Sequence, residues 1–465
     1  MRIETETPRD LGEPVESIKV DETSLSAPVK KPEPRLYRVI WRWHFYAGLI
    51  VAPVLLIASV TGGLYVFREE LERMIYPQLM FVEPQPQIIS YNEQLAKASA
   101  VLPAGAIAHG ISISDDPARA TSVIAEVGHE RYVSVYVNQY TGAVLGLLDY
   151  DRSLFGVILN IQRTLLAGTI GRVIVELATS WGVILIVTGL YLWWPRGGAK
   201  ALGVWLPRLR GKSYLIWRDW HTVPGFYFSA LAFLVMGTGL FFTLIFARGY
   251  QAVAYMTNSY PASFINPPKS MSKEGSKKGS NEGRKEAATK LGVDEIIAVA
   301  RREQSQKEMY VDFPHTAEDS FTVYAGSYDS PSTLTFLYLD QYSGAALDVI
   351  RWSDMSAAAK AQVSAYAIHI GSIFGAPTKI LAVLICLLIV AMSVTGAAMW
   401  WVRRPHGKTG FPVKPAGVKP AKWLIVVICL LGALTPAAGI SMILILIGDW
   451  LLRLWRKRAL RQMTP

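Results

Sequence analysis

Three of the seven histidines lie in or beside long apolar runs, where an ionisable side chain is costly and usually functional. They are His44, His221 and His369. His44 and His221 share a local pattern, since each follows a tryptophan and precedes a glycine, Gly48 or Gly225, by four residues. Two imidazoles on facing helices, one on each side of a planar macrocycle, form a bis-His b-type haem site. We therefore predict that His44 and His221 are haem ligands.

Aromatic residues and glycines are concentrated around these histidines. Aromatic side chains would pack on a porphyrin, and glycines would let its ring approach the backbone. The alternative is an ordinary interfacial aromatic belt with plain helix packing, and we assign most of the tryptophans to that belt. Without a Cys-x-x-Cys-His motif, any haem would be non-covalent. The residues concerned are Trp41, Trp43, Phe45, Trp217, Trp220, Phe226, Tyr227, Gly48, Gly168, Gly225 and Gly375.

Composition and motifs exclude several other classes of site. The two cysteines, Cys386 and Cys429, lie in apolar runs, which excludes a disulfide framework and a cysteine-based zinc or iron–sulfur site. Phosphate-binding, dinucleotide-binding and hydrolase motifs are absent from the sequence, so electrons would come from a membrane quinol or a separate cytoplasmic donor. The net charge of +11 is better explained by cationic loops on a membrane than by nucleic-acid binding.

The elements that must position the histidines are membrane spans. The chain of 465 residues is 51% hydrophobic and only 18% charged, with a mean hydropathy of +0.26. Four uncharged stretches are each about long enough to cross a bilayer as a helix, which takes about 20 residues. They are Phe45–Phe67, Leu177–Pro195, Phe226–Ala247 and Ile380–Val402.

The distribution of basic residues predicts which side of the membrane each connection faces. Basic residues precede the first span, and basic residues without acids occupy 196–218 and follow the fourth span, so these segments are predicted to be cytoplasmic. The two long segments between the spans would then face outward. Residues 423–455 form either a re-entrant hairpin, which we favour, or a fifth span.

The chain also repeats itself, as a unit of span, outer module and span used twice. At the offset of 207 residues that relates the second and fourth spans, Gln162 matches His369. The matching pairs are Trp43-His44 with Trp220-His221, Thr61-Gly62 with Thr238-Gly239, Asn138–Ala143 with Asp340–Ala345, and Thr188-Gly189 with Thr395-Gly396.

Each outer segment reads as a small α+β module. A helical pattern (91–101 or 293–302) precedes strands of alternating or β-branched residues, and a Tyr-Thr/Ser-Gly turn leads into a last strand. The strands before that turn are predicted over 107–113, 120–127 and 132–137, and over 309–313, 320–325 and 333–339.

These motifs together resemble the PepSY-associated transmembrane family, over roughly residues 36–455. The Trp-His pair, the Asx/Gln-Tyr-Thr-Gly turn, the Gly168 to Arg172 stretch and the Thr-Gly-Leu-Tyr-Leu-Trp-Trp-Pro-Arg end of the second span carry the resemblance. The resemblance implies an inner-membrane haem b protein of bacteria that reduces a ferric siderophore during iron uptake. It implies a multi-span helical membrane protein with two periplasmic PepSY-like modules.

The second predicted haem site departs from the family pattern, because Gln162 stands where a histidine is usual. Either His369 binds a five-coordinate haem facing Gln162, which we favour, or an outer histidine (His109, His129 or His315) supplies the other ligand, or this haem is absent. Arg163, Arg172 and Lys379 could pair with haem propionates or simply extend to the interface. Glu176 could handle a proton or a quinone, or could be an interfacial acid.

The sequence thus predicts an oxidoreductase with two haems b, one at His44 and His221 and the other at His369. Two alternatives remain: a membrane-tethered PepSY regulator or peptidase inhibitor without redox activity, and a permease for the iron complex. The predicted partners are membrane lipid, a ferric siderophore and the electron donor, and the oligomeric state stays open.

The predicted segments are a disordered tail (1–34), first span (36–76), module 1 (78–152), interfacial segment and second span (153–195), cytoplasmic loop (196–218), third span (219–248), module 2 (249–355) with a flexible insertion (267–290), interfacial segment and fourth span (360–402), cytoplasmic loop (403–422), C-terminal apolar segment (423–455) and basic tail (456–465).

Overall fold

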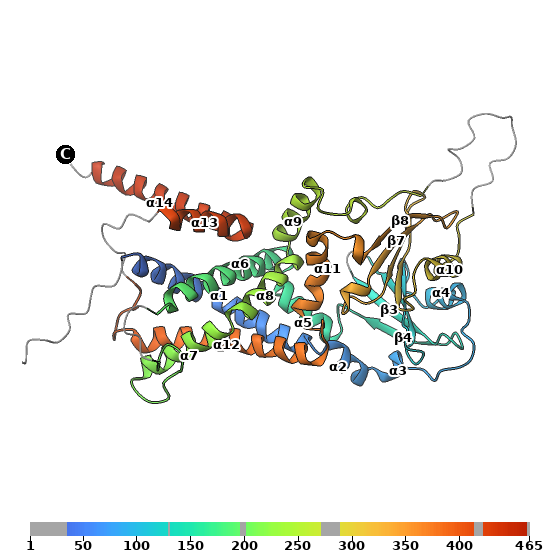
Figure 1. Cartoon of the computed structure of the whole chain (residues 1–465), viewed down its shortest axis with the longest axis horizontal. Coiled ribbons are helices and arrows are strands. Elements are labelled where there is room, and N and C mark those ends of the chain that lie inside the picture. The colour runs from blue at the N-terminus through green and yellow to red at the C-terminus, as the bar shows by residue number, and fades with distance from the viewer. Residues whose placement is uncertain (1–34, 129–130, 196–200, 271–288, 413–421, 463–465) are drawn as a thin grey trace, which may run out of the picture.

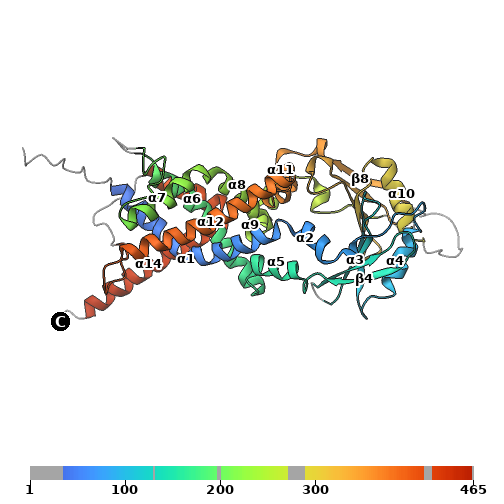
Figure 2. The same ribbon diagram turned by 90° about the horizontal axis from the view of Figure 1, so that it is seen from below.

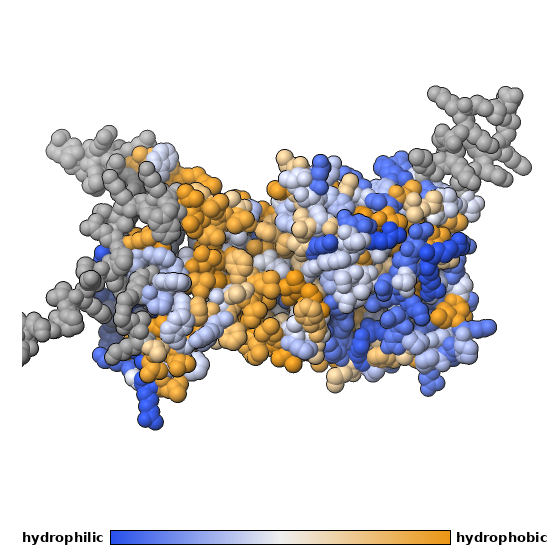
Figure 3. Space-filling model, in the orientation of Figure 1, coloured by the Kyte–Doolittle hydropathy of each residue, from blue (hydrophilic) through white to orange (hydrophobic). Residues whose placement is uncertain are grey.

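A computed structural model describes residues 35–128, 131–195, 201–270, 289–412 and 422–462. The predicted tail over 1–34, most of the predicted insertion over 267–290, and His129 lie outside these ranges. A helical bundle forms one end of the molecule and a β-sheet domain forms the other, with short helices between them (Figure 1). On the face shown in Figure 3, a band of apolar residues crosses the bundle, whereas the sheet domain is mainly hydrophilic.

Three single helices among the described residues are long and apolar enough to cross a membrane: α1 (Arg35–Tyr65), α6 (Gly168–Trp193) and α12 (Ala376–Arg403). Their length follows from uninterrupted apolar sequence, because about 20 residues at 1.5 Å per residue match the hydrocarbon core. α1 packs against both α6 and α12. The chain is therefore a membrane protein with a separate sheet domain.

The segment expected to be one span over 219–248 is broken. It forms α7 (Ser213–Tyr227) and α8 (Ser229–Gly239), which continues as a 3₁₀ turn to Phe242, and the two parts are bent by 70°. Pro224 lacks the N–H that an α-helix requires four residues after Trp220, and the helix ends one turn beyond it. Counted as one bent span, α7 and α8 raise the number of candidate spans to four.

Short helices connect the bundle to the sheet domain. They are α2 (Arg68–Ile75), α3 (Pro77–Met80), α5 (Leu154–Thr164), α9 (Ile245–Met256) and α11 (Ala357–His369). Gly168 and Gly375 have positive φ angles of 54° and 69° where α6 and α12 begin, and added Cβ atoms there would meet nothing within 4 Å. These two glycines serve the backbone turn, since a residue with a Cβ rarely adopts these φ angles.

The two outer modules form one eight-stranded antiparallel sheet, in the order β4-β3-β2-β1-β5-β6-β7-β8. The second half begins where β5 pairs with β1, so the halves share a seam in the middle of the sheet. The strand positions agree with the sequence prediction to within two residues at each end. The strands are β1 (Ile107–Ile113), β2 (Thr121–Glu126), β3 (Tyr132–Val137), β4 (Val144–Asp149), β5 (Met309–Asp312), β6 (Phe321–Ala325), β7 (Thr335–Leu339) and β8 (Ala346–Arg351).

Helices α4 (Tyr91–Ser99) and α10 (Val293–Glu303) pack on the sheet in one shared core. Each helix also caps the other: Asp294 accepts the backbone N–H of Tyr91 (2.7 Å), and Asn92 accepts that of Val293 (2.7 Å). A side-chain acceptor at a helix N-terminus satisfies an otherwise unpaired N–H. This reciprocal capping joins the two modules at a second place.

The turns before β4 and β8 repeat each other bond for bond. Asn138 Oδ1 accepts the N–H of Tyr140 at 2.9 Å, and Asp340 Oδ1 accepts that of Tyr342 at 2.9 Å. Gly142 and Gly344 have φ angles of 73° and 70°, which a residue with a Cβ rarely adopts. The Asx-Gln-Tyr-Thr/Ser-Gly motif is therefore a structural turn.

The C-terminal segment forms two helices, α13 (Lys422–Leu434) and α14 (Pro436–Gln462), that turn back at Thr435 (Figure 1). Gly432 and Gly439 allow close approach, since a Cβ on Gly439 would lie 2.4 Å from the Gly432 carbonyl oxygen. α14 also contacts α6 and α9. This arrangement is a helical hairpin against the bundle.

Candidate functional site

A cavity of about 1190 Å³ lies between α1, α6, α7, α8 and α12, and both His44 and His221 line it. His44 comes from α1 and His221 from α7, so the two imidazoles enter from different helices. The lining is mainly apolar and includes Leu55, Met236 and Met392. Concave apolar sites with a few polar groups are typical of cofactor pockets.

Each imidazole is fixed by a threonine on a neighbouring helix. His44 Nδ1 lies 2.9 Å from Thr188 Oγ1, and His221 Nδ1 lies 3.0 Å from Thr395 Oγ1. The Thr188 hydroxyl donates to the Ile184 carbonyl at 2.9 Å. The Thr395 hydroxyl similarly donates to the Ala391 carbonyl, at 2.6 Å.

These bonds favour one tautomer of both histidines. A threonine hydroxyl has one proton, and when it donates that proton to the carbonyl of its own helix, its oxygen accepts from Nδ1 of the imidazole. Nδ1 therefore carries the proton, and Nε2 keeps its lone pair. A lone pair on Nε2 with the opposite nitrogen held by a second residue is the usual state of a metal-ligating histidine.

Each imidazole also packs against the glycine that follows its threonine. A Cβ on Gly189 would lie 3.3 Å from His44 Cε1, and one on Gly396 would lie 3.5 Å from His221 Cε1. The Thr-Gly pair of one helix thus binds and accommodates the histidine of another. Both threonines therefore contact a histidine of another helix as well as the backbone of their own helix.

Part of the predicted aromatic group lines the cavity and part does not. Trp41, Phe45 and Phe226 line it, and Phe226 stacks on Trp193 with ring centroids 3.6 Å apart. Others lie among the exposed residues, as expected for an interfacial belt. These exposed residues are Trp43, Trp217, Trp220 and Tyr227.

Two arginines that the sequence analysis did not single out also line the cavity. Arg208 Nε lies 2.6 Å and Arg218 Nη2 lies 2.7 Å from the carboxylate of Asp219, which is fully buried. Two guanidinium groups sharing one carboxylate leave one positive charge uncompensated within this cluster. Such a charge suits an anionic group such as a propionate.

Gln162 and His369 occupy equivalent places elsewhere in the bundle and do not line this cavity. A Cβ on Gly62 would lie 2.9 Å from Gln162 Nε2, and one on Gly239 would lie 2.8 Å from His369 Cε1. Both glycines belong to Thr-Gly pairs, as at the first site. His369 Nδ1 donates to the Val235 carbonyl at 2.9 Å, so its Nε2 also keeps a lone pair.

The predicted propionate partners have different surroundings. Lys379 is buried, and its Nζ lies 2.7 Å from Glu70 Oε1, so this cation already has a partner. Arg163 is exposed, and Arg172 is half-buried.

Glu176 is neither exposed nor interfacial: it is fully buried. Its carboxylate accepts the backbone N–H groups of Leu244 (3.0 Å), Ile245 (2.8 Å) and Phe246 (2.7 Å). These N–H groups begin α9, so Glu176 caps that helix from α6. A carboxylate with three donors has a structural role, which corrects the interfacial alternative.

Of the other histidines named as possible haem ligands, the two that the structure describes lie in the sheet domain and not in the bundle. His109 on β1 and His315 after β5 belong to the sheet domain. Their ring nitrogens lie 3.0 Å apart from each other.

Comparison with known families finds one match, over residues 41–403, to the family described as PepSY-associated TM region. A comparison with curated proteins found no similar sequence. The matched range includes both Trp-His pairs, all four Thr-Gly pairs and both halves of the sheet.

Proposed function

Because the chain belongs to the PepSY-associated transmembrane family, we propose that it is an inner-membrane haem b electron-transfer protein that reduces a ferric siderophore. In this proposal the chain is an internally duplicated four-span protein, and the sheet domain lies in the periplasm. Bound haem would supply a one-electron iron couple.

One observation carries the proposal: two repeat-equivalent histidines, each with Nε2 available, line one apolar cavity. Thr188 and Thr395 hold the imidazoles in the ligating tautomer, and Gly189 and Gly396 leave room beside the rings. Arg208 and Arg218, which line this cavity, would pair with the propionates of the haem bound there.

The second site would be bound by His369 alone, with Gln162 opposite as a vacant or weak ligand position. His44 and Gly62 are eighteen residues apart on α1, which corresponds to about 27 Å along a helix axis at 1.5 Å per residue. Two sites at the two ends of one bundle suit electron transfer across a membrane.

The acceptor is proposed on chemical grounds and on the family resemblance. Hard oxygen donors hold ferric iron much more tightly than ferrous iron, so one-electron reduction releases the metal. The donor would be a quinol or a cytoplasmic reductant, since the sequence encodes no flavin or nicotinamide motif.

The experiment is a dithionite-reduced minus oxidised visible spectrum of the purified protein, with haem counted per chain. We expect a b-type signal near two haems per chain, and H44A and H221A should each remove most of the low-spin component. H406A is the matched control, because His406 is exposed in the loop after α12. A colourless protein after expression with ample haem would favour the regulator or permease alternatives, and unchanged spectra in both variants would exclude the His44 and His221 site.

A further inference from the structure

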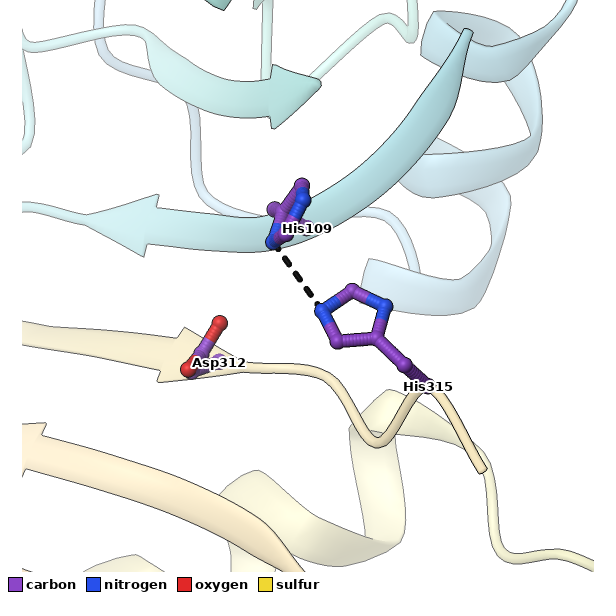
Figure 4. Close-up of side chains that lie close together, drawn as sticks. All are labelled: His109, Asp312 and His315. Atoms are coloured by element: carbon purple, nitrogen blue, oxygen red, sulfur yellow. Dashed lines mark hydrogen bonds between the residues drawn. The ribbon is translucent and has the colours of Figure 1, made fainter. Parts of the chain in front are cut away.

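The seam of the sheet brings together two histidines and an aspartate from opposite halves of the chain. His109 lies on β1, Asp312 ends β5, and His315 follows it in the next loop (Figure 4). One ligand atom of each residue lies within 4.8 Å of the other two. These residues belong to neither haem site.

We propose that His109 Nδ1, His315 Nε2 and the Asp312 carboxylate bind a divalent first-row transition-metal ion, with a coordination position left open to solvent. Two imidazoles and one carboxylate are a ligand set that Zn²⁺ and Fe²⁺ both accept. Because His315 is exposed, a fourth ligand could reach the ion from solution. The proposal is independent of haem binding.

The spacing of the two nitrogens is close to that in a metal site. His109 Nδ1 and His315 Nε2 are 3.0 Å apart. Two imidazole nitrogens on one tetrahedral Zn²⁺ lie about 3.3 Å apart, given Zn–N distances near 2.05 Å. A shift of a few tenths of an ångström would therefore turn the hydrogen-bonded pair into a chelating pair.

A second carboxylate orients His109 for this role. Glu126 Oε2 lies 2.8 Å from His109 Nε2, and an ionised carboxylate can only accept, so Nε2 carries the proton and Nδ1 the lone pair. A carboxylate behind a ligating histidine is a common outer contact of metal sites. His315 would move its proton from Nε2 to its other ring nitrogen when the ion binds, so no net proton is lost from a neutral pair.

A backbone irregularity aims His109 at the seam. Ala108 pairs with Ala125 and Gly110 pairs with Ile124, so His109 is the extra residue of a β-bulge. The His109 carbonyl accepts the N–H of Phe313 at 2.7 Å, which joins the bulge to β5 directly after Asp312. Bulges commonly redirect a side chain at a functional position.

The charge balance also favours a cation. Asp312 is half-buried beside the two imidazoles, and Glu126 lies on the other side of His109. The loop carrying His315 is held by Asp319, whose carboxylate accepts the N–H groups of His315 and Thr316. A dication would balance the charge of the Asp312 and Glu126 carboxylates, which lie close to the two imidazoles.

The test is titration of the purified full-length protein in detergent with ZnCl₂ by calorimetry, after chelator treatment and dialysis. We expect one Zn²⁺ per chain, and at least tenfold weaker binding in H315Q and in D312N. H406Q is the control for an exposed histidine outside the seam. E126Q should weaken binding about tenfold through the orientation of His109.

A second measurement distinguishes loss of metal binding from misfolding and compares Zn²⁺ with Fe²⁺. Zn²⁺ should raise the melting temperature of the wild type and H406Q but not of H315Q, while the haem spectrum of H315Q stays unchanged. Anaerobic competition with Fe²⁺ then ranks the ions. Equal Zn²⁺ affinity in H315Q, D312N and H406Q would overturn the proposal, whatever the outcome for haem.

Discussion

Each of the four Thr-Gly pairs lies against one side chain of a neighbouring helix. His44, His221, His369 and Gln162 each lie against the glycine of such a pair. In the first two cases the threonine hydroxyl also accepts from Nδ1. The threonines should therefore control the tautomer and basicity of the proposed ligands.

The first prediction concerns a substitution that removes the His44–Thr188 hydrogen bond with little change in side-chain shape. T188V should retain the cavity but weaken haem binding, by about 10- to 100-fold if Thr188 acts as an outer contact of a ligand. The potential of the haem should shift as well. Redox titration and haem retention after dilution measure both effects.

A matched control for T188V lies on the same helix. The Thr179 hydroxyl donates to the Val175 carbonyl of its own helix, at 2.9 Å. T179V therefore removes the same atom without touching an imidazole. Equal changes in T179V and T188V would contradict a role for the Thr188 bond.

The second prediction concerns the glutamine that replaces a ligand. Gln162 Nε2 lies where an imidazole on α5 would face Gly62, as His369 faces Gly239. Q162H should convert a high-spin outer haem to a low-spin one, observed by electron paramagnetic resonance. Q162L removes the amide without adding a ligand and should leave the haem high-spin. If the wild type has no high-spin component, the five-coordinate site is wrong.

At the scale of elements, α9 depends on a capping residue from another helix. Glu176 satisfies three backbone N–H groups at the start of α9. Nothing in the local sequence of α9 provides this acceptor, because Leu244 precedes it. The geometry favours a structural role over a proton or quinone role.

The third prediction follows from that contact. E176A leaves these N–H groups without an acceptor and should lower the free energy of unfolding by about 2–3 kcal/mol. The melting temperature in detergent should fall by several degrees, with an unchanged haem spectrum. E176Q keeps one acceptor oxygen and should be intermediate. A stable E176A variant with slower quinol oxidation would instead support the redox role.

The sequence predicted most elements but not the contacts between them. Alternation and β-branching located the strands, because these signals are local. The bend between α7 and α8 was missed, although Pro224 was visible, since a proline inside an apolar run does not by itself tell whether a helix kinks or ends. The Glu176 cap and the His–Thr bonds were missed because they join residues far apart in the chain.

At the scale of the whole molecule, the two halves are joined at the sheet rather than only in the bundle. Ile111 opposite Val311 buries both side chains at the β1–β5 seam, and α4 and α10 cap each other. The sequence predicted two modules but could not show their pairing, because an edge strand gives no signal of its partner. Figure 2 shows α1, α6, α7 and α12 in the bundle at one end of the molecule and the single sheet domain at the other.

The last prediction tests the sidedness of this arrangement. The described parts of the basic connections and the sheet domain lie at opposite ends of the bundle (Figure 1), so the positive-inside rule predicts that the sheet domain faces outward. In a variant with Cys386 and Cys429 replaced by alanine, S330C in the sheet domain should react with an impermeant maleimide in spheroplasts. T409C, after α12, should react only after permeabilisation.

T464C should behave like T409C if α13 and α14 form a hairpin that returns to the side where it begins. Labelling of T464C in intact spheroplasts would mean that α14 crosses the membrane, and would leave the basic residues from Arg456 onward outside against the charge rule.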